Sequence, residues 1–102
     1  MFKITSKHGF HILLNGCTLS VQFGGGNYCE NYNDTIETSK TEPLKKCHNA
    51  EMAIWITETG EWISKEYILE TTGSIDEDQD DVMPRQTVAD MHKMLEWIAA
   101  RP

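Results

Sequence analysis

Hydrophobic and polar residues alternate along the first quarter of the chain. Two short apolar-rich runs are separated by a polar turn, and Asn15-Gly16 then supplies the dipeptide best suited to a tight hairpin. Every second residue from Cys17 to Phe23 is apolar, a period that is typical of a strand with one buried face. Residues 1–23 are therefore predicted to form a three-stranded antiparallel meander.

A polar segment then interrupts this pattern. Three consecutive glycines after Phe23 stop the sheet, and the chain up to Asn49 is rich in Asn, Thr, Ser, Glu and Lys. A connection of this length is unusual in a small domain and usually has a functional role. Residues 24–49 are therefore predicted to form a long loop.

The apolar pattern returns over residues 50–70 and predicts a hairpin. Residues 51–57 are apolar on both faces, which favours a central strand. After a turn at Gly60, residues 61–64 are predicted to return as a fifth strand. The pattern over 65–70 fits a strand and a helix equally well.

Two more segments complete the chain. A glycine, a proline and a run of acids predict an exposed acidic loop over 71–86. Thr87 is a good helix N-cap with Asp90 placed for a capping box, and a helix packed on one face of the sheet is predicted over 87–101. Its apolar residues recur at helical spacing, namely Val88, Met91, Leu95 and Ile98. The chain, 1–102, is thus expected to be a single α+β domain, with an antiparallel sheet of about five strands and one C-terminal α-helix.

The net charge of −7 is unevenly distributed along the 102 residues. Residues 1–50 hold five lysines against four acids, which gives +1, whereas residues 51–102 hold four cations against twelve acids, which gives −8. An acidic half repels phosphate backbones, so direct DNA or RNA binding is not expected. The same field attracts a basic surface, such as the nucleic-acid groove of another protein. Solubility alone is the alternative explanation.

Cysteine usage and the lack of long apolar runs predict a cytoplasmic protein. The three cysteines form no Cys-x-x-Cys pair and are expected to remain free thiols in a reducing compartment. The first ten residues show no continuous apolar stretch of a secretory signal. No apolar run approaches the length of a membrane span, so no membrane partner is expected.

The segment that ends the third predicted strand has the composition of a recognition loop. Consecutive glycines let backbone N–H groups approach a ligand closely, and the tyrosines and asparagines after them supply amphipathic surface and adaptable hydrogen bonds. The segment is neither a dinucleotide fingerprint nor a P-loop, and a glycine-rich bulge explains it equally well. The predicted ligand-binding residues are Phe23, Gly24, Gly25, Gly26, Asn27, Tyr28, Asn31 and Tyr32.

The acidic run at 76–81 begins like a calcium loop but lacks the glycine and the final glutamate that define one. A solvated loop is the favoured interpretation. As a contact for a basic partner, its predicted residues are Asp76, Asp78, Asp80 and Asp81. The histidines and Cys47 match no zinc module, so neither a metal nor a cofactor is expected.

Support for catalysis is thin. The chain contains no nucleophile elbow, no cysteine-protease signature and no zinc-protease motif. Pairing Cys29 with a histidine from elsewhere in the chain is too generic to identify a nucleophile. Trp55 and Trp62, on either side of the predicted hairpin tip, are most simply explained by cross-strand packing. We therefore predict a binding protein rather than an enzyme.

Several segments together resemble a family of small uncharacterised proteins of tailed phages and prophages. The centre of the resemblance is the strand that ends in the glycine-rich Asn27-Tyr28-Cys29 segment, and the acidic stretch at 70–85 departs from the family pattern. The other matching segments are residues 2–5, 9–12, 50–55, 86–87 and 95–97, the last being Leu95-Glu96-Trp97. The resemblance spans most of the chain and offers no catalytic residues.

The resemblance implies an accessory phage protein in the cytoplasm of an infected bacterial host, where small acidic proteins of this kind often antagonise antiviral defence. In one hypothesis the protein blocks a nucleic-acid-handling defence protein, with its acidic half in place of phosphates. In another it sequesters a small nucleotide signal, as a homo-oligomer whose subunits build the pocket between them. A small enzyme of unknown chemistry is a third hypothesis.

Overall fold

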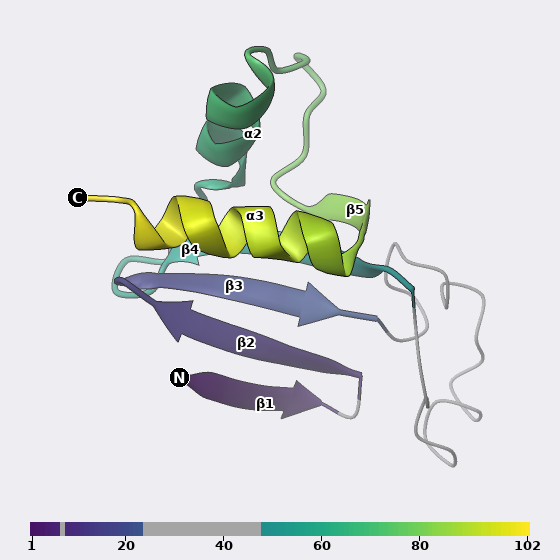
Figure 1. The fold of residues 1–102 in the computed structure, drawn as a ribbon, viewed down its shortest axis with the longest axis vertical. Coiled ribbons are helices and arrows are strands. Elements are labelled where there is room, and N and C mark those ends of the chain that lie inside the picture. The colour runs from purple at the N-terminus through teal and green to yellow at the C-terminus, as the bar shows by residue number, and fades with distance from the viewer. Residues whose placement is uncertain (7, 24–47) are drawn as a thin grey trace.

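The described residues of the chain form an antiparallel sheet with two helices, as Figure 1 shows for the computed structural model. The structure describes residues 1–6, 8–23 and 48–102. The strands are β1 (Phe2–Ser6), β2 (Gly9–Leu14), β3 (Cys17–Gln22), β4 (Ala50–Ile56) and β5 (Met83–Gln86), and the helices are α2 (Ser64–Thr72) and α3 (Val88–Ala99). The strands lie in the order β1-β2-β3-β4-β5, and all neighbouring pairs are antiparallel. The predicted α+β class, with about five strands and a C-terminal helix, is confirmed.

The predicted hairpin between β2 and β3 is present, and its turn also forms hydrogen bonds with the C-terminal end of α3. Asn15 and Gly16 both have positive φ, 49° and 76°, as the turn favoured by Asn-Gly requires. The Asn15 side-chain amide donates hydrogen bonds to the backbone oxygens of Ile98 and Arg101, each at 2.9 Å. Carbonyls at the end of a helix lack partners within the helix, so this turn caps α3.

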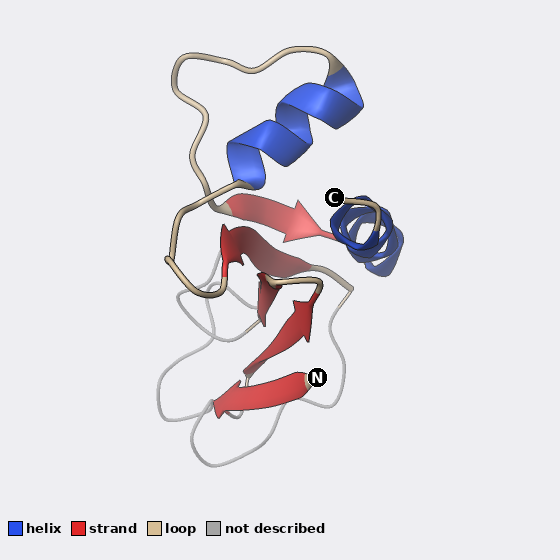
Figure 2. Cartoon of the chain, turned by 90° about the vertical axis from the view of Figure 1, so that its left-hand side faces the viewer, coloured by secondary structure: helices blue, strands red, loops and turns tan. Residues whose placement is uncertain are grey.

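The core lies between the sheet and α3. Figures 1 and 2 show this helix lying across one face of the sheet. The apolar residues Cys17, Leu19 and Val21 of β3 are buried on one face of the sheet, as their period of two predicts. Thr18 and Ser20 on the opposite face are buried too, so the prediction that only one face of this strand is buried is wrong. Met94 and Ile98 of α3 are fully buried in the same cluster. The apolar face of the strand and the apolar stripe of the helix thus form one contiguous core.

The hairpin predicted in the second half is only partly correct. The expected strand at 61–64 is reduced to one bridge between Trp62 and Trp55, and α2 begins at Ser64. The two indoles pack edge to face with their centroids 5.2 Å apart, which confirms the predicted cross-strand packing. The buried Ser64 hydroxyl accepts a hydrogen bond from the backbone N–H of Ile54 at 2.9 Å. Such a side-chain bond replaces a ladder bond, so the chain leaves the sheet and continues as a helix.

The loop predicted over 71–86 is also only partly correct, because its last four residues form β5. Met83 is buried and pairs with Met52 of β4, which holds this strand at the edge of the sheet. Pro84 follows, and an edge strand tolerates a proline because one side of its backbone has no neighbouring strand. Since these residues lack alternating apolar positions, the sequence pattern does not predict the strand.

The predicted capping box at the start of α3 is confirmed. The Thr87 hydroxyl accepts a hydrogen bond from the backbone N–H of Asp90 at 3.2 Å, and the Asp90 carboxylate accepts one from the backbone N–H of Thr87 at 2.8 Å. Two otherwise unpaired donors are satisfied reciprocally in this way. The helix ends at Ala99, slightly before the predicted boundary.

Protonation of His11 is expected to destabilise the fold. Its ring packs edge to face on Trp55 with the centroids 5.1 Å apart, and burial, together with the charge of Lys3, lowers its pKa from the ordinary value of 6.5. The unfolded chain therefore binds this proton more readily than the folded one. The contribution of His11 to stability is complete above pH 6.5 and is lost as the pH falls toward the folded-state pKa.

Urea unfolding at neutral and mildly acidic pH measures this effect. His11→Gln should flatten the decline of the unfolding free energy with falling pH. His92→Gln, at a position whose side chain is 72% exposed, is the matched control and should retain the decline. Equal pH dependence in the wild type and His11→Gln would contradict the assignment.

Candidate functional site

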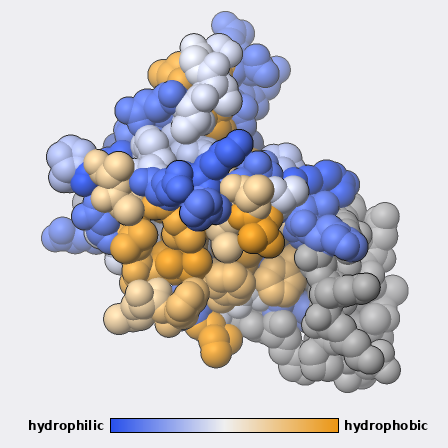
Figure 3. Space-filling view, viewed as in Figure 1, coloured by the Kyte–Doolittle hydropathy of each residue, from blue (hydrophilic) through white to orange (hydrophobic). Residues whose placement is uncertain are grey.

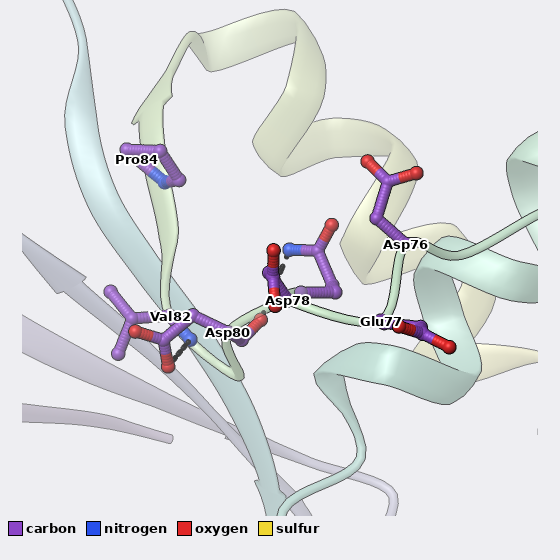
Figure 4. Close-up of a pocket in the computed structure, with 7 residues that line it drawn as sticks. Asp76, Glu77, Asp78, Asp80, Val82 and Pro84 are labelled. Atoms are coloured by element: carbon purple, nitrogen blue, oxygen red, sulfur yellow. Dashed lines mark hydrogen bonds between the residues drawn. The ribbon is translucent and has the colours of Figure 1, made fainter.

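An acidic loop joins α2 to β5 and lines an open cavity. Gly73, with φ 86°, ends the helix, and the buried Met83 anchors the other end of the loop. The cavity, which we call the acidic cavity, has a volume of about 680 Å³. Its lining residues, seen in Figure 4, are Asp76, Glu77, Asp78, Gln79, Asp80, Val82 and Pro84. Four of these seven side chains are carboxylates, so the lining is strongly acidic.

Local hydrogen bonds give this loop a defined shape. The backbone N–H of Gln79 donates to the Asp76 carbonyl at 3.0 Å, which closes a tight turn. The Asp80 carboxylate accepts a hydrogen bond from the backbone N–H of Val82 at 3.2 Å, drawn as a dashed line in Figure 4. An aspartate that bonds its own backbone two residues further on stabilises a turn. Asp80 therefore has a structural role beside its charge.

Three carboxylates of the acidic cavity have no partner within the described ranges of the chain. The side chains of Asp76, Glu77 and Asp78 are exposed and make no hydrogen bond or ion pair there. Figure 4 shows the carboxylates directed to different sides of the loop rather than toward one point. A single cation needs oxygens that converge on it, and no group of side chains suited to a metal ion occurs among the described residues. Dispersed charges instead match an extended basic surface.

A second cavity, of about 440 Å³, adjoins the first, and Gln79 and Pro84 line both. Asp90 and Lys93 of α3 contribute opposite charges to its lining, so it is close to neutral. Burial, and then the charge of Asp90, raise the pKa of the Tyr67 hydroxyl from the ordinary value of 10.0, so this group stays neutral at physiological pH. The remaining lining residues are Ile68, Thr71, Thr72, Met83 and Gln86.

Contacts between α2 and α3 fix the walls of this second cavity. The Trp97 ring packs edge to face on Tyr67 with the centroids 5.5 Å apart, and its indole N–H donates to the Glu70 carboxylate. The Arg101 guanidinium lies 4.9 Å from the centre of the Trp97 ring and 3.3 Å from the Glu66 carboxylate. The two acids of α2 are exposed but bonded to other side chains of the protein, in contrast to Asp76, Glu77 and Asp78, which have no partner among the described residues.

The structure brings most of the predicted partner-binding residues together. Asp76, Asp78 and Asp80 line the acidic cavity, and Asp81 lies next to them in the chain but is not part of the lining. Glu77 lines the cavity but is absent from the predicted set, because the calcium-like spacing singles out Asp76, Asp78 and Asp80. The second cavity has no signal in the sequence, since its walls come from three separate elements.

The predicted glycine-rich ligand site falls almost entirely outside the described residues. Phe23 is the exception: it is half-buried and packs edge to face on Phe10, with the centroids 6.3 Å apart, against the core. The residues not described are Gly24, Gly25, Gly26, Asn27, Tyr28, Asn31 and Tyr32. A ligand-binding role for this segment stays a prediction.

Comparisons of the chain with protein-family models, with curated protein sequences and with solved structures find no match. The resemblance to phage proteins therefore stays a prediction. Within the described part of the chain, no helix combines the length and apolar character needed to cross a membrane.

Proposed function

We propose that this chain is a non-enzymatic binding protein that uses the acidic cavity to engage a basic surface of a partner protein. The observation that carries the proposal is the set of three exposed carboxylates, Asp76, Glu77 and Asp78, which no described residue neutralises. Like charges held close together repel one another, so a basic surface that neutralises them is bound favourably.

The acidic cavity suits a protein surface better than a small ligand. Its carboxylates are spread along a loop that is anchored at both ends, by the end of α2 and by Met83. Concave acidic surfaces attract basic partners over a distance and speed their association, an effect that falls steeply with ionic strength. Binding through this loop is therefore expected to be fast and strongly dependent on salt.

The resemblance to phage proteins suggests which class of protein the partner belongs to. Under the proposal, the partner is a nucleic-acid-handling protein of bacterial antiviral defence, and the carboxylates occupy the positions of phosphates in its basic groove. The described lining of the acidic cavity contains no lysine or arginine that could hold a phosphate. The acidic surface thus favours this blocking role over the sequestration of a nucleotide.

Neutralising Asp76, Glu77 and Asp78 should weaken binding to a basic probe by about tenfold, since exposed charge pairs contribute roughly 0.2–1 kcal/mol each. The variant is Asp76→Asn, Glu77→Gln, Asp78→Asn, and it leaves the structural Asp80 intact. The probe is an oligo-arginine peptide, with affinity measured by isothermal titration calorimetry at low and physiological salt.

A matched control changes the net charge equally at other exposed positions. The control variant is Glu58→Gln, Glu61→Gln, Glu96→Gln, whose sites lie in the turn after β4 and on α3. The proposal requires the first variant to lose affinity and the control to retain it. Equal losses would show that the peptide responds only to net charge, and an unchanged affinity in the first variant would exclude the acidic cavity.

A further inference from the structure

The outer edge of β1 has backbone groups available for another strand. Met1 and Leu13 exchange two hydrogen bonds, of 3.0 and 2.8 Å, between the first residues of the chain and β2. In an antiparallel pair, residues alternate between bonding toward the neighbour and pointing away from it. The N–H and C=O groups of Phe2 and Ile4 therefore point outward, where no described strand pairs with β1.

The same two residues place large apolar side chains in solvent. Phe2 is 76% exposed and Ile4 is 86% exposed. Their cross-strand partners are Ile12 and Phe10, which pack on the core, so all four lie on the face of the sheet that α3 covers further along. Figure 3 shows apolar surface gathered beside α3 on this face. Edge strands normally expose few apolar residues, because an exposed apolar edge tends to pair with a strand of another molecule.

Charge does not oppose association at this edge. The loop that lines the acidic cavity leads into β5, which is at the opposite end of the strand order from β1, and Figure 1 shows this loop far from β1. The described residues of β1 contain one charged side chain, that of Lys3. Two molecules that meet along β1 therefore keep their acidic cavities far apart.

We propose that a second copy of this chain pairs with β1 in antiparallel fashion, joining two five-stranded sheets into one. The two-fold axis passes beside Ile4, so that the two Ile4 residues exchange a pair of backbone hydrogen bonds. Lys3 then lies opposite Thr5 of the second copy. A register centred on Lys3 would instead oppose two lysines, which is unfavourable. The two-fold axis also aligns Phe2 and Ile4 of both copies on one face.

The expected dimer is weak. Phe2 and Ile4 together offer roughly 300 Å² of side-chain area per molecule, which is less than half of the about 800 Å² that each partner buries in a standard interface. The register shift between Ile4 and Ser6 also limits the length of regular pairing. The protein is therefore expected to be monomeric when dilute and dimeric at high concentration, and both acidic cavities stay open in the dimer.

Sedimentation equilibrium from micromolar to near-millimolar protein tests the dimer. Ile4→Lys places two like charges across the axis and should raise the dissociation constant at least about tenfold. Ile4→Pro removes the outward N–H without removing a bond to β2 and should have the same effect. Ile75→Lys makes the same change of charge at another exposed apolar residue and should leave the dimer intact. A wild type that stays monomeric throughout, or Ile4 variants that dimerise normally, would overturn the proposal.

Amide hydrogen exchange of the wild type tests the same edge without any variant. The Ile4 amide should exchange quickly in dilute protein and slow down as the concentration rises. The Lys3 amide, which bonds toward β2, should be protected at every concentration. Concentration-independent exchange at Ile4 would overturn the proposed interface.

Discussion

Leu19→Ala is expected to lower the free energy of unfolding by about 3–4 kcal/mol, because the fully buried side chain leaves a cavity when truncated. Leu19 lies in the central part of β3, in the cluster that includes Met94 and Ile98 of α3. Atoms on both sides of the site thus lose packing contacts. Urea denaturation followed by circular dichroism measures the change.

The matched control for this truncation is Leu69→Ala on α2, where the leucine is 47% exposed. Alanine favours the helix slightly more than leucine does, so this change should alter stability by less than about 1 kcal/mol. If the two variants lost similar amounts of stability, the core between the sheet and α3 would not be the main source of stability.

Trp97→Ala is expected to destabilise the protein by about 2–3 kcal/mol, less than a fully buried tryptophan because this ring is half-buried. The change removes the ring contact with Tyr67, the cation–π contact with Arg101 and the indole bond to Glu70. These contacts join α2 to α3. Thermal and urea unfolding measure the loss, and amide exchange should show faster opening of α2 than of β3.

Trp97→Phe separates the two kinds of contact at this position. The phenyl ring retains the edge-to-face contact with Tyr67 and the contact with Arg101 but cannot donate to Glu70. We expect this variant to lose about 1 kcal/mol. A loss as large as that of the alanine variant would mean that the hydrogen bond to Glu70, rather than the aromatic packing, holds α2 in place.

The elements that sequence reasoning predicts well are those whose apolar residues follow one simple period. In β3, residues Cys17, Leu19 and Val21 alternate and face the core. In α3, the capping residues Thr87 and Asp90 mark the start of the apolar stripe. In both cases the local pattern and the tertiary environment agree, so the pattern is sufficient.

The elements that sequence reasoning misses depend on tertiary contacts. α2 begins where the Ser64 hydroxyl takes a backbone hydrogen bond from Ile54, ten residues earlier in the chain. β5 is held by the pairing of Met83 with Met52, and the other residues of that strand carry no apolar alternation. Local patterns contain no information on such partners, so the sequence predicts a loop where β5 forms and does not distinguish a strand from a helix over 65–70.

For the acidic cavity too, the sequence predicts one part and only the folded structure defines the other. Composition identifies Asp76, Asp78, Asp80 and Asp81 as an exposed acidic run, because charged residues without partners stay in solvent. The concave shape depends on how α2 and β5 flank the loop, which only the folded chain defines. Likewise, the exposed edge at Phe2 and Ile4 follows from the position of β1 at the end of the strand order.

An amide-resolved NMR titration of the full chain with the oligo-arginine peptide tests the proposed binding surface most directly. Backbone signals of residues 74–82 should shift during the titration, and the shifts should fade as salt is added. Signals from β1 and from the turn at 57–60 should stay in place. Shifts centred on another surface, or spread evenly over all exposed acids, would contradict a binding role for the acidic cavity.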